Sequence, residues 1–166
     1  MPMRTTLDAG LSLLGLDLAE DKRQTLCEFA RAMVKQNEVM NLTTITEESD
    51  VYSKHFLDSL SIVGMIEPRS FENISVIDIG TGAGFPGLPI AIAFPGAKVT
   101  LVDSLQKRVK FLNETIELLG LENVTVFHAR AEEFARIESE REKYDIACSR
   151  AVARLNILAE YCLPFV

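Results

Sequence analysis

Residues 76–87, Val-Ile-Asp-Ile-Gly-Thr-Gly-Ala-Gly-Phe-Pro-Gly, place an apolar run directly before four closely spaced glycines. A short apolar run of this kind is typical of a buried strand. Glycines after a strand let the backbone approach a ligand closely and lead into a helix whose N-terminus faces that ligand. The segment therefore predicts a strand, a ligand-binding loop and a helix. The structural alternative is a glycine turn that only packs the strand against the helix.

Two classes of ligand use such a loop. Gly82, Gly84 and Gly87 have the spacing of the dinucleotide-binding motif G-x-G-x-x-G, and Asp103 stands where an acidic residue would hold a ribose. The carboxylate of Asp78 would repel a pyrophosphate, whereas S-adenosylmethionine presents an ammonium and a sulfonium. We therefore expect S-adenosylmethionine as the cofactor, with Asp78 near its methionine ammonium and Asp103 on its ribose. A dinucleotide-binding oxidoreductase is the alternative from another class.

Apolar runs alternate with helical patterns from residue 74 onward. Strands are expected at residues 75–79, 98–102, 124–127 and 144–148, and helices at residues 85–94, 104–119, 131–137 and from about 153. Ser104 is expected to cap the second of these helices and Gly120 to end it. Such alternation predicts an α/β fold with a doubly wound, mainly parallel sheet of the Rossmann-like, class I methyltransferase type. Because four strands are few for this fold and the final residues 163–166 are apolar, we expect further C-terminal strands to be missing.

The first 65 residues have helical patterns instead. Apolar residues at helical spacing predict a helix over residues 20–38 and a second helix from Thr46 to about Val63. A boundary at residues 66–70 divides the chain into an N-terminal helical extension, residues 1–67, and a Rossmann-like domain, residues 68–166. His55 and Asp58 fall on one face of the second helix, where a partly buried structural pair is the alternative to a functional base.

Composition limits the class of protein. The 166 residues are 48% hydrophobic and 25% charged, as in a globular protein, and no segment suits a membrane span or a signal peptide. We therefore expect a cytoplasmic protein. Three cysteines and two histidines argue against disulfides and against a metal site, so no metal is predicted. The net charge of -7 argues against a broad nucleic-acid surface, so any RNA contact must be local.

Several side chains near strand ends have two possible roles. Glu132, beside Ala131, suits an adenine contact or a first-turn acid favoured by the helix dipole. Arg150 suits a ligand contact or a surface ion pair with Glu132 or Asp103. Cys148 could act as a thiolate nucleophile, but no neighbour would stabilise a thiolate there, so a small buried residue is preferred.

Five motifs together resemble one family. They are residues 77–89 (Ile-Asp-Ile-Gly-Thr-Gly-Ala-Gly-Phe-Pro-Gly-Leu-Pro), Asn-Leu-Thr at 41–43, Lys-His-Phe-Leu-Asp-Ser-Leu at 54–60, Arg-Ala-Glu at 130–132 and Ser-Arg-Ala at 149–151. These residues resemble the bacterial small-subunit ribosomal RNA guanine-N7 methyltransferases, also known as the glucose-inhibited division protein B family. The resemblance covers about residues 20–166, and one departure is Ala129, where a glycine is expected.

The resemblance implies a cytoplasmic enzyme that methylates N7 of one guanine in small-subunit (16S) ribosomal RNA, free or within a ribosomal particle. It implies S-adenosylmethionine as cofactor, no metal and, for the full-length protein, a monomer. With the motif argument above, the expected cofactor-binding residues are Asp78, Gly80, Gly82, Gly84, Phe85, Asp103, Ala131, Glu132 and Arg150. The expected catalytic or substrate-side residues are Asn41, Lys54, His55, Arg130 and Arg150.

Methylation of guanine N7 removes no proton, so this reaction needs neither a general base nor a covalent nucleophile. Orientation should dominate, and in favourable cases it contributes about 7–11 kcal/mol. Two alternatives stay open on the sequence alone. One is a methyltransferase for a small molecule or a protein, which the acidic charge favours. The other is a non-catalytic module that only binds the cofactor.

Overall fold

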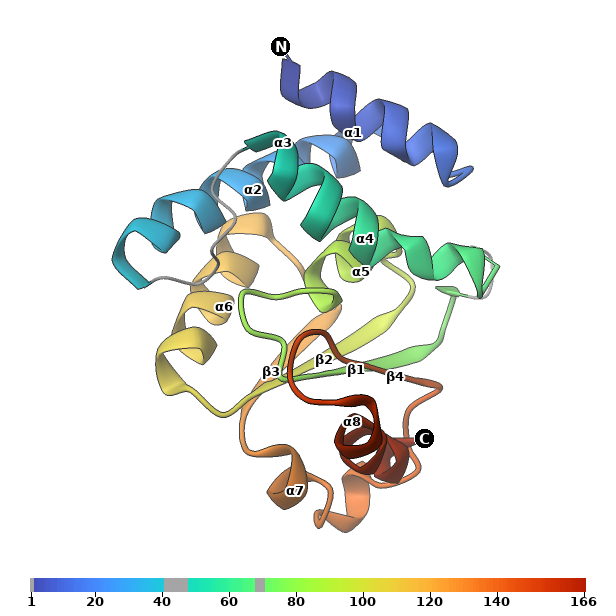
Figure 1. The fold of residues 1–166 in the computed structure, drawn as a ribbon, viewed down its shortest axis with the longest axis vertical. Helices are drawn as coiled ribbons and strands as arrows, with labels where there is room; N and C mark the ends of the chain where they lie inside the picture. The colour runs from blue at the N-terminus through green and yellow to red at the C-terminus, as the bar shows by residue number, and fades with distance from the viewer. Residues whose placement is uncertain (1, 41–47, 68–70) are drawn as a thin grey trace.

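The structure, a computed structural model, describes residues 2–40, 48–67 and 71–166. Its centre is a parallel sheet of four strands, β1 (Ser75–Ile79), β2 (Lys98–Asp103), β3 (Val124–His128) and β4 (Ile146–Cys148). The strand order is β3-β2-β1-β4, so the chain steps outward from β1 to β3 and then returns to the other side of β1 (Figure 1). In open α/β sheets, ligands bind at the carboxyl ends of the strands where this direction reverses. Here that point lies between β1 and β4.

Helices cover both faces of the sheet. On one face lie α5 (Gly87–Ala93), α6 (Gln106–Leu119) and the N-terminal helices, and on the other lie α7 (Ala131–Phe134), α8 (Leu155–Cys162) and the short turns η4 (Glu138–Glu140) and η5 (Leu163–Phe165) (Figure 1). The side chains of β1 alternate accordingly: Val76 packs with α5, whereas Ile77 and Ile79 pack with Phe134 and Phe165. The predicted doubly wound α/β fold is confirmed.

The boundaries of the elements differ slightly from those predicted. The helix after the glycine loop begins at Gly87, two residues later than expected, because residues 82–86 form turns. Ser104 does not cap α6, since Leu105 occupies the N-cap position and makes no side-chain cap bond. The N–H of Leu105 instead donates to Oδ1 of Asp103 at 2.9 Å. Gly120 ends α6 in the left-handed conformation, with φ of 63°, as predicted.

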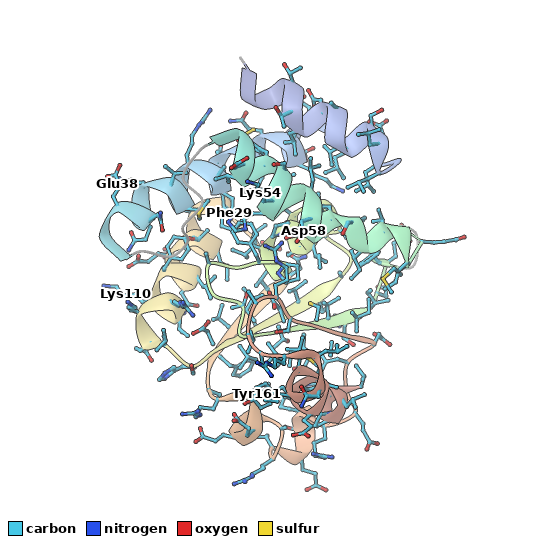
Figure 2. All side chains as sticks on the ribbon, in the orientation of Figure 1. Phe29, Glu38, Lys54, Asp58, Lys110 and Tyr161 are labelled. Atoms are coloured by element: carbon cyan, nitrogen blue, oxygen red, sulfur yellow. The ribbon has the colours of Figure 1, made fainter. Side chains whose placement is uncertain are left out.

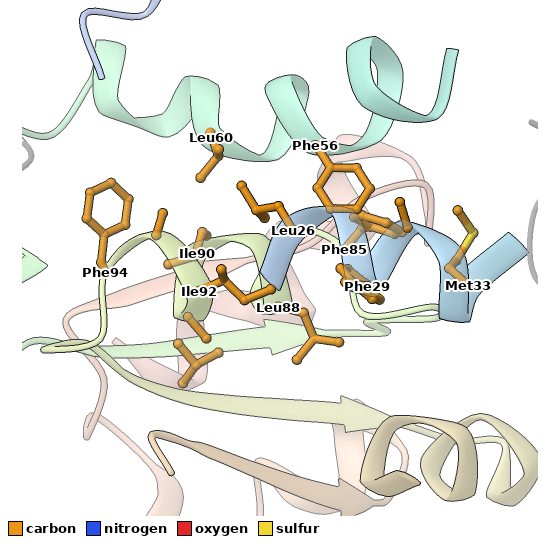
Figure 3. Packing of buried hydrophobic residues seen from close by; sticks show 14 of the residues in the cluster. Leu26, Phe29, Met33, Phe56, Leu60, Phe85, Leu88, Ile90, Ile92 and Phe94 are labelled. Carbon is orange, nitrogen blue, oxygen red and sulfur yellow. The ribbon is translucent and has the colours of Figure 1, made fainter. Parts of the chain in front are cut away.

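The N-terminal part consists of α1 (Pro2–Leu13), α2 (Glu20–Met40), α3 (Glu48–Val51), the π-turn η1 (Tyr52–Leu57), α4 (Asp58–Leu60) and η2 (Ser61–Gly64). Thr46 and Asn41 lie outside the described residues. The helices of this part share one hydrophobic core with α5, in which Phe29 of α2 and Phe56 of η1 pack around Phe85 and Leu88 (Figure 3). The division at residue 67 remains a prediction from sequence pattern, and the two parts are packed through a common core.

Candidate active site

Two cavities lie at the carboxyl ends of the strands, one on each side of Gly80. The cavity toward β3 has a volume of about 280 Å³, and the cavity toward η1 has a volume of about 630 Å³. They share Gly80, Asp103, Ser104 and Val152 as lining residues. These volumes are close to or within the range of about 300–1,000 Å³ that small-molecule sites occupy. The two cavities together form an elongated site at the predicted edge of the sheet.

The β3-side cavity joins apolar surfaces to two carboxylates. Ala129, Ile157 and Tyr161 supply apolar surface, while Asp103 and Glu132 supply the carboxylates. Oε2 of Glu132 lies 4.0 Å from Nε of Arg130, and the side chains of Arg130 and Glu132 are 68% and 45% exposed. This combination suits a flat heteroaromatic ring attached to a sugar diol, because the ring needs apolar faces and the diol needs acceptors.

Asp103 ends β2 and is buried, with 2% of its surface exposed. Its Oδ2 accepts a hydrogen bond from the N–H of Gly82 at 2.9 Å, and Nη1 of Arg108 lies 3.5 Å away. With Leu105 on Oδ1, both carboxylate oxygens therefore bind protein groups. Asp103 fixes the glycine loop as well as lining both cavities.

Asp78 is fully buried on the side of β1 that faces α5. Its Oδ2 accepts hydrogen bonds from Oγ1 of Thr81 at 2.7 Å and from the N–H of Gly87 at 2.8 Å. Its Oδ1 has no hydrogen-bond partner among the residues that the structure describes. Burial raises the pKa of Asp78 to about 6, against the lowering effects of the two hydrogen bonds. Asp78 thus binds the glycine loop from the buried side of that loop. Its contact with the methionine ammonium of the cofactor remains a prediction.

Arg150 reaches the helical segment at the top of the η1-side cavity. Its guanidinium pairs with the carboxylate of Asp58 and lies 3.0 Å from Nδ1 of His55. The ion pair with Glu132 or Asp103 that the sequence left open is therefore wrong, since Asp58 is the partner. Arg150 thus contacts both members of the His55–Asp58 pair that the sequence offered as the alternative to a functional base. Burial, followed by the charge of Arg150, lowers the pKa of His55.

Phe85 packs inside the protein rather than into open space. Its ring stacks on His55 with a centroid separation of 4.7 Å and on Phe29 at 5.1 Å, and 6% of its surface is exposed. It still lines the η1-side cavity. Phe134 is buried, whereas Phe127 is 37% exposed because β3 is an edge strand.

The structure brings most predicted site residues to the two cavities. Those that line at least one cavity are Lys54, His55, Gly80, Gly82, Phe85, Asp103, Arg130, Ala131, Glu132 and Arg150. Asp78 and Gly84 are absent from the described lining; a Cβ on Gly84 would lie 2.5 Å from Cδ1 of Leu88, so Gly84 allows close packing onto α5. Asn41 is not in the described part of the chain.

Several lining residues from the segment after β4 were not predicted from the sequence. Val152, Ile157 and Tyr161 come from the loop and helix that follow Arg150. A Cβ on Gly80 would lie 2.5 Å from Cγ2 of Val152, so this glycine is needed for close approach as well as for its φ of 68°. The rule that ligands bind beyond the carboxyl ends of parallel strands could have pointed to this segment.

Cys148 does not line the described part of either cavity. Its Sγ donates to the carbonyl of Ile77 at 3.4 Å, and burial raises the pKa of its thiol well above the usual range. A thiol that stays protonated is a poor nucleophile. Cys148 is therefore a structural residue, as preferred from the sequence. Groups of three or more His, Cys, Asp or Glu side chains that could hold a metal do not occur among the described residues.

The fold places the chain in a class. A variant of MtNAS in complex with S-adenosylmethionine shares the fold with a TM-score of 0.52 and 18% identity, over 78% of this chain and 47% of that one. Precorrin-6y C5,15-methyltransferase from Geobacter metallireducens has a TM-score of 0.51 and 16% identity, over 74% and 57%. At this identity the likeness concerns the fold alone, which is an α/β, Rossmann-like fold.

Closer relatives identify the family. The family model for rRNA small subunit methyltransferase G matches residues 22–166. Ribosomal RNA small subunit methyltransferase G of Alkaliphilus metalliredigens is 49% identical over all of this chain and 69% of its own length. The protein of the same name from Acetivibrio thermocellus is 46% identical over all of this chain and 67% of its own length. The chain belongs to the rRNA small subunit methyltransferase G family.

Family membership confirms the predicted resemblance, the enzyme class and the cofactor, S-adenosylmethionine. The chain therefore does not belong to the alternative class, the dinucleotide-dependent oxidoreductases. The residues present also fit the cofactor, because the cavities combine apolar faces, the carboxylates of Asp103 and Glu132, and the loop glycines Gly80 and Gly82 in their lining. Within the described ranges, no helix has the length and apolar character that crossing a membrane requires.

Proposed function

We propose that this protein transfers the methyl group of S-adenosylmethionine to N7 of one guanine in 16S ribosomal RNA. The observation that supports N7 is the chemistry of the groups around the cavities. Asp103 has both oxygens bound to protein groups, and Nδ1 of His55 faces the Arg150 guanidinium. Cysteines do not line the described parts of the cavities. A lone pair that attacks without losing a proton needs no base and no thiolate.

The residues of the β3-side cavity would hold the nucleoside part of the cofactor. Glu132 and the backbone of Ala131 would contact the adenine, and Asp103 would accept hydrogen bonds from the ribose. Gly80 and Gly82 would let the backbone approach the methionine part. The bound cofactor supplies a sulfonium methyl group, which is open to attack by a ring nitrogen. The protein's task is then to orient the guanine and to exclude water.

Exposed cations at the rim would receive the RNA. Lys54 lines the η1-side cavity and Arg130 lines the β3-side cavity, and both are more than half exposed. Two cations beside a cleft can bind phosphates locally, although the whole chain is acidic. Asn41, Lys54, His55 and Arg130 remain the proposed substrate-side residues. Recognition of free RNA or of a ribosomal particle, the cytoplasmic location and the monomeric state remain predictions.

The test is methyl transfer from tritiated S-adenosylmethionine to 16S RNA and to assembled small subunits. RNA transcribed with 7-deazaguanosine in place of guanosine is the matched control, because it lacks N7 and keeps the other base-pairing groups. We expect label in the guanosine RNA and background in the 7-deazaguanosine RNA. Equal labelling of the two RNAs would refute N7 as the acceptor, and labelling of a ribosomal protein alone would refute RNA as the substrate.

A further inference from the structure

The side chain of Arg150 is held by the N-terminal helical segment. Besides the ion pair with Asp58, it makes four polar contacts with that segment. They are those of Nη1 with the carbonyl of His55 (3.2 Å) and Oγ of Ser59 (3.1 Å), and those of Nη2 with the carbonyl of Lys54 (3.3 Å) and Nδ1 of His55 (3.0 Å). A guanidinium has five N–H donors in a rigid plane, so a set of acceptors this dense fixes its orientation.

The aromatic rings beside the Arg150 guanidinium favour a planar cation at this position. The guanidinium carbon lies 5.8 Å from the ring centroid of Phe85, and His55 stacks on the same ring. The side chains of Arg150 and Asp58 are 26% and 56% exposed, so Arg150 is the more sheltered partner and solvent reaches the pair from the Asp58 side. The π-turn η1 supplies the two carbonyl acceptors, and Figure 2 shows Lys54 and Asp58 on this helical segment, above the glycine loop.

The backbone next to Arg150 shapes both cavities. Ala151 has a φ of 55°, a left-handed conformation that costs a non-glycine residue about 1–2 kcal/mol and persists only where the surroundings hold it. Val152 follows, packs onto Gly80 and lines both cavities. At the other end of the loop, Oγ of Ser149 donates to the carbonyl of Ile79 at 2.6 Å. The loop of residues 149–154 is thus fixed between β1 and the Arg150 contacts.

We propose that Asp58 is a positioning residue for the cofactor site. It holds the Arg150 guanidinium, and Arg150 in turn holds Ala151 and Val152 against Gly80. Asp58 itself is absent from the described lining of either cavity. The N-terminal helical segment, whose Lys54 and His55 line the η1-side cavity, therefore also controls the shape of the site through a residue outside the lining. This inference rests on the proposed function, because it assigns the shaped site to S-adenosylmethionine.

The experiment compares Asp58→Asn with Asp50→Asn. Both are carboxylates of the same helical segment that pair with a cation, Asp50 with Lys54 at 2.7 Å, and the side chains of Asp58 and Asp50 are 56% and 42% exposed. Calorimetric titration with S-adenosylhomocysteine is carried out well below the unfolding temperature, with folding checked by circular dichroism. We expect Asp58→Asn to weaken binding on the order of fivefold. Asp50→Asn should bind like the wild type.

Two further variants separate positioning from loss of structure. Asp58→Glu keeps the charge and should recover most of the affinity. The double variant Asp58→Asn with Arg150→Gln should bind no more weakly than Arg150→Gln alone, because both changes break one linkage. Unchanged affinity in Asp58→Asn would overturn the proposal. Additive losses of affinity from Asp58→Asn and Arg150→Gln in the double variant would also overturn it.

A ligand-free measurement distinguishes this proposal from the proposed function. Amide hydrogen exchange of residues 149–154 should be faster in Asp58→Asn than in the wild type and in Asp50→Asn, while α6 is unchanged. If the wild type does not bind S-adenosylhomocysteine, the cofactor assignment fails and the role of Asp58 in shaping the cofactor site fails with it. If the wild type binds but exchange in residues 149–154 is equal in all three proteins, the role of Asp58 alone is refuted.

Discussion

Asp78→Asn should stabilise the protein at neutral pH. The folded protein raises the pKa of Asp78 from an ordinary 3.8 to about 6, mainly by burial. At 1.36 kcal/mol for each pKa unit, the buried charge costs about 3 kcal/mol at pH 7.5. Asparagine has the same shape, can still accept from Thr81 and Gly87, and carries no charge. We expect it to recover about 1–3 kcal/mol of the free energy of unfolding, or about 2–4 °C in Tm for each kcal/mol.

The pH dependence identifies the cause. Because the folded pKa of Asp78 is the higher one, its cost is fully present above pH 6 and falls as the folded carboxyl takes up a proton. It is absent below the unfolded value of about 4. The stability difference between Asp78→Asn and the wild type, measured by urea unfolding, should therefore be largest at pH 7.5 and approach zero at pH 4.

Asp145→Asn is the control with the opposite sign. Asp145 precedes β4 and accepts hydrogen bonds from the N–H and Oγ of Ser75 at 2.7 and 2.8 Å. These bonds lower its pKa, so its charge stabilises the folded protein above the unfolded pKa. Asp145→Asn should therefore destabilise at pH 7.5. If Asp78→Asn is also less stable than the wild type at pH 7.5, or if its effect does not vary with pH, the argument from burial is refuted.

Three other experiments test the site. Acidification should weaken S-adenosylhomocysteine binding once His55 takes up a proton, because protonated His55 cannot accept at Nδ1 from Arg150; burial and the Arg150 charge lower the pKa of His55, so this step lies below the ordinary 6.5. An affinity that does not fall anywhere in the acidic range in which the protein stays folded would contradict this. Gly80→Ala should reduce the affinity for S-adenosylhomocysteine at least tenfold in a titration, because the new Cβ would lie 2.5 Å from Val152 and the backbone φ at this position is 68°. Unchanged affinity would contradict the tight contact between Gly80 and Val152. Cys148→Ala should retain the methylation rate within about twofold, because the thiol is buried and protonated, whereas loss of turnover in a folded variant would indicate a nucleophile.

Local patterns were enough to predict the sheet and the glycine loop. The runs that became β1 to β3 begin where they were predicted, and the prediction that α/β alternation gives parallel strands is confirmed. Gly80 was predicted as a site residue from the glycine loop and the family resemblance, and Asp103 from its position after the second strand, where an acidic residue would hold a ribose. Both line the cavities.

Contacts between distant segments could not be read from the same patterns. The partner of Arg150 is Asp58, 92 positions earlier, and this pairing depends on how the N-terminal helices pack over the sheet. The burial of Asp78 depends in a similar way on where α5 begins, because Gly87 donates to its carboxylate. Val152 was missed since an apolar residue in an irregular segment has no periodic signal, and its role comes from contact with Gly80.

The charged groups predicted as ligands bind protein groups around Gly80. Asp78 binds the N–H of Gly87, Asp103 binds the N–H of Gly82, and Arg150 binds the segment around Asp58. Asp78 and Asp103 therefore fix the glycine loop from two neighbouring strands, while Arg150 joins the segment after β4 to the N-terminal helical segment. We expect the backbone of the loop to need little reorganisation when a cofactor binds. The cost falls on Asp103, since a ribose would have to share or replace the contacts of its carboxylate with Gly82 and Arg108. The affinity for the cofactor is then set by the difference between the hydrogen bonds that Asp103 makes with the protein and those that it makes with the ribose. A substitution that weakens the contact of Arg108 with Asp103 should therefore favour binding of the ribose.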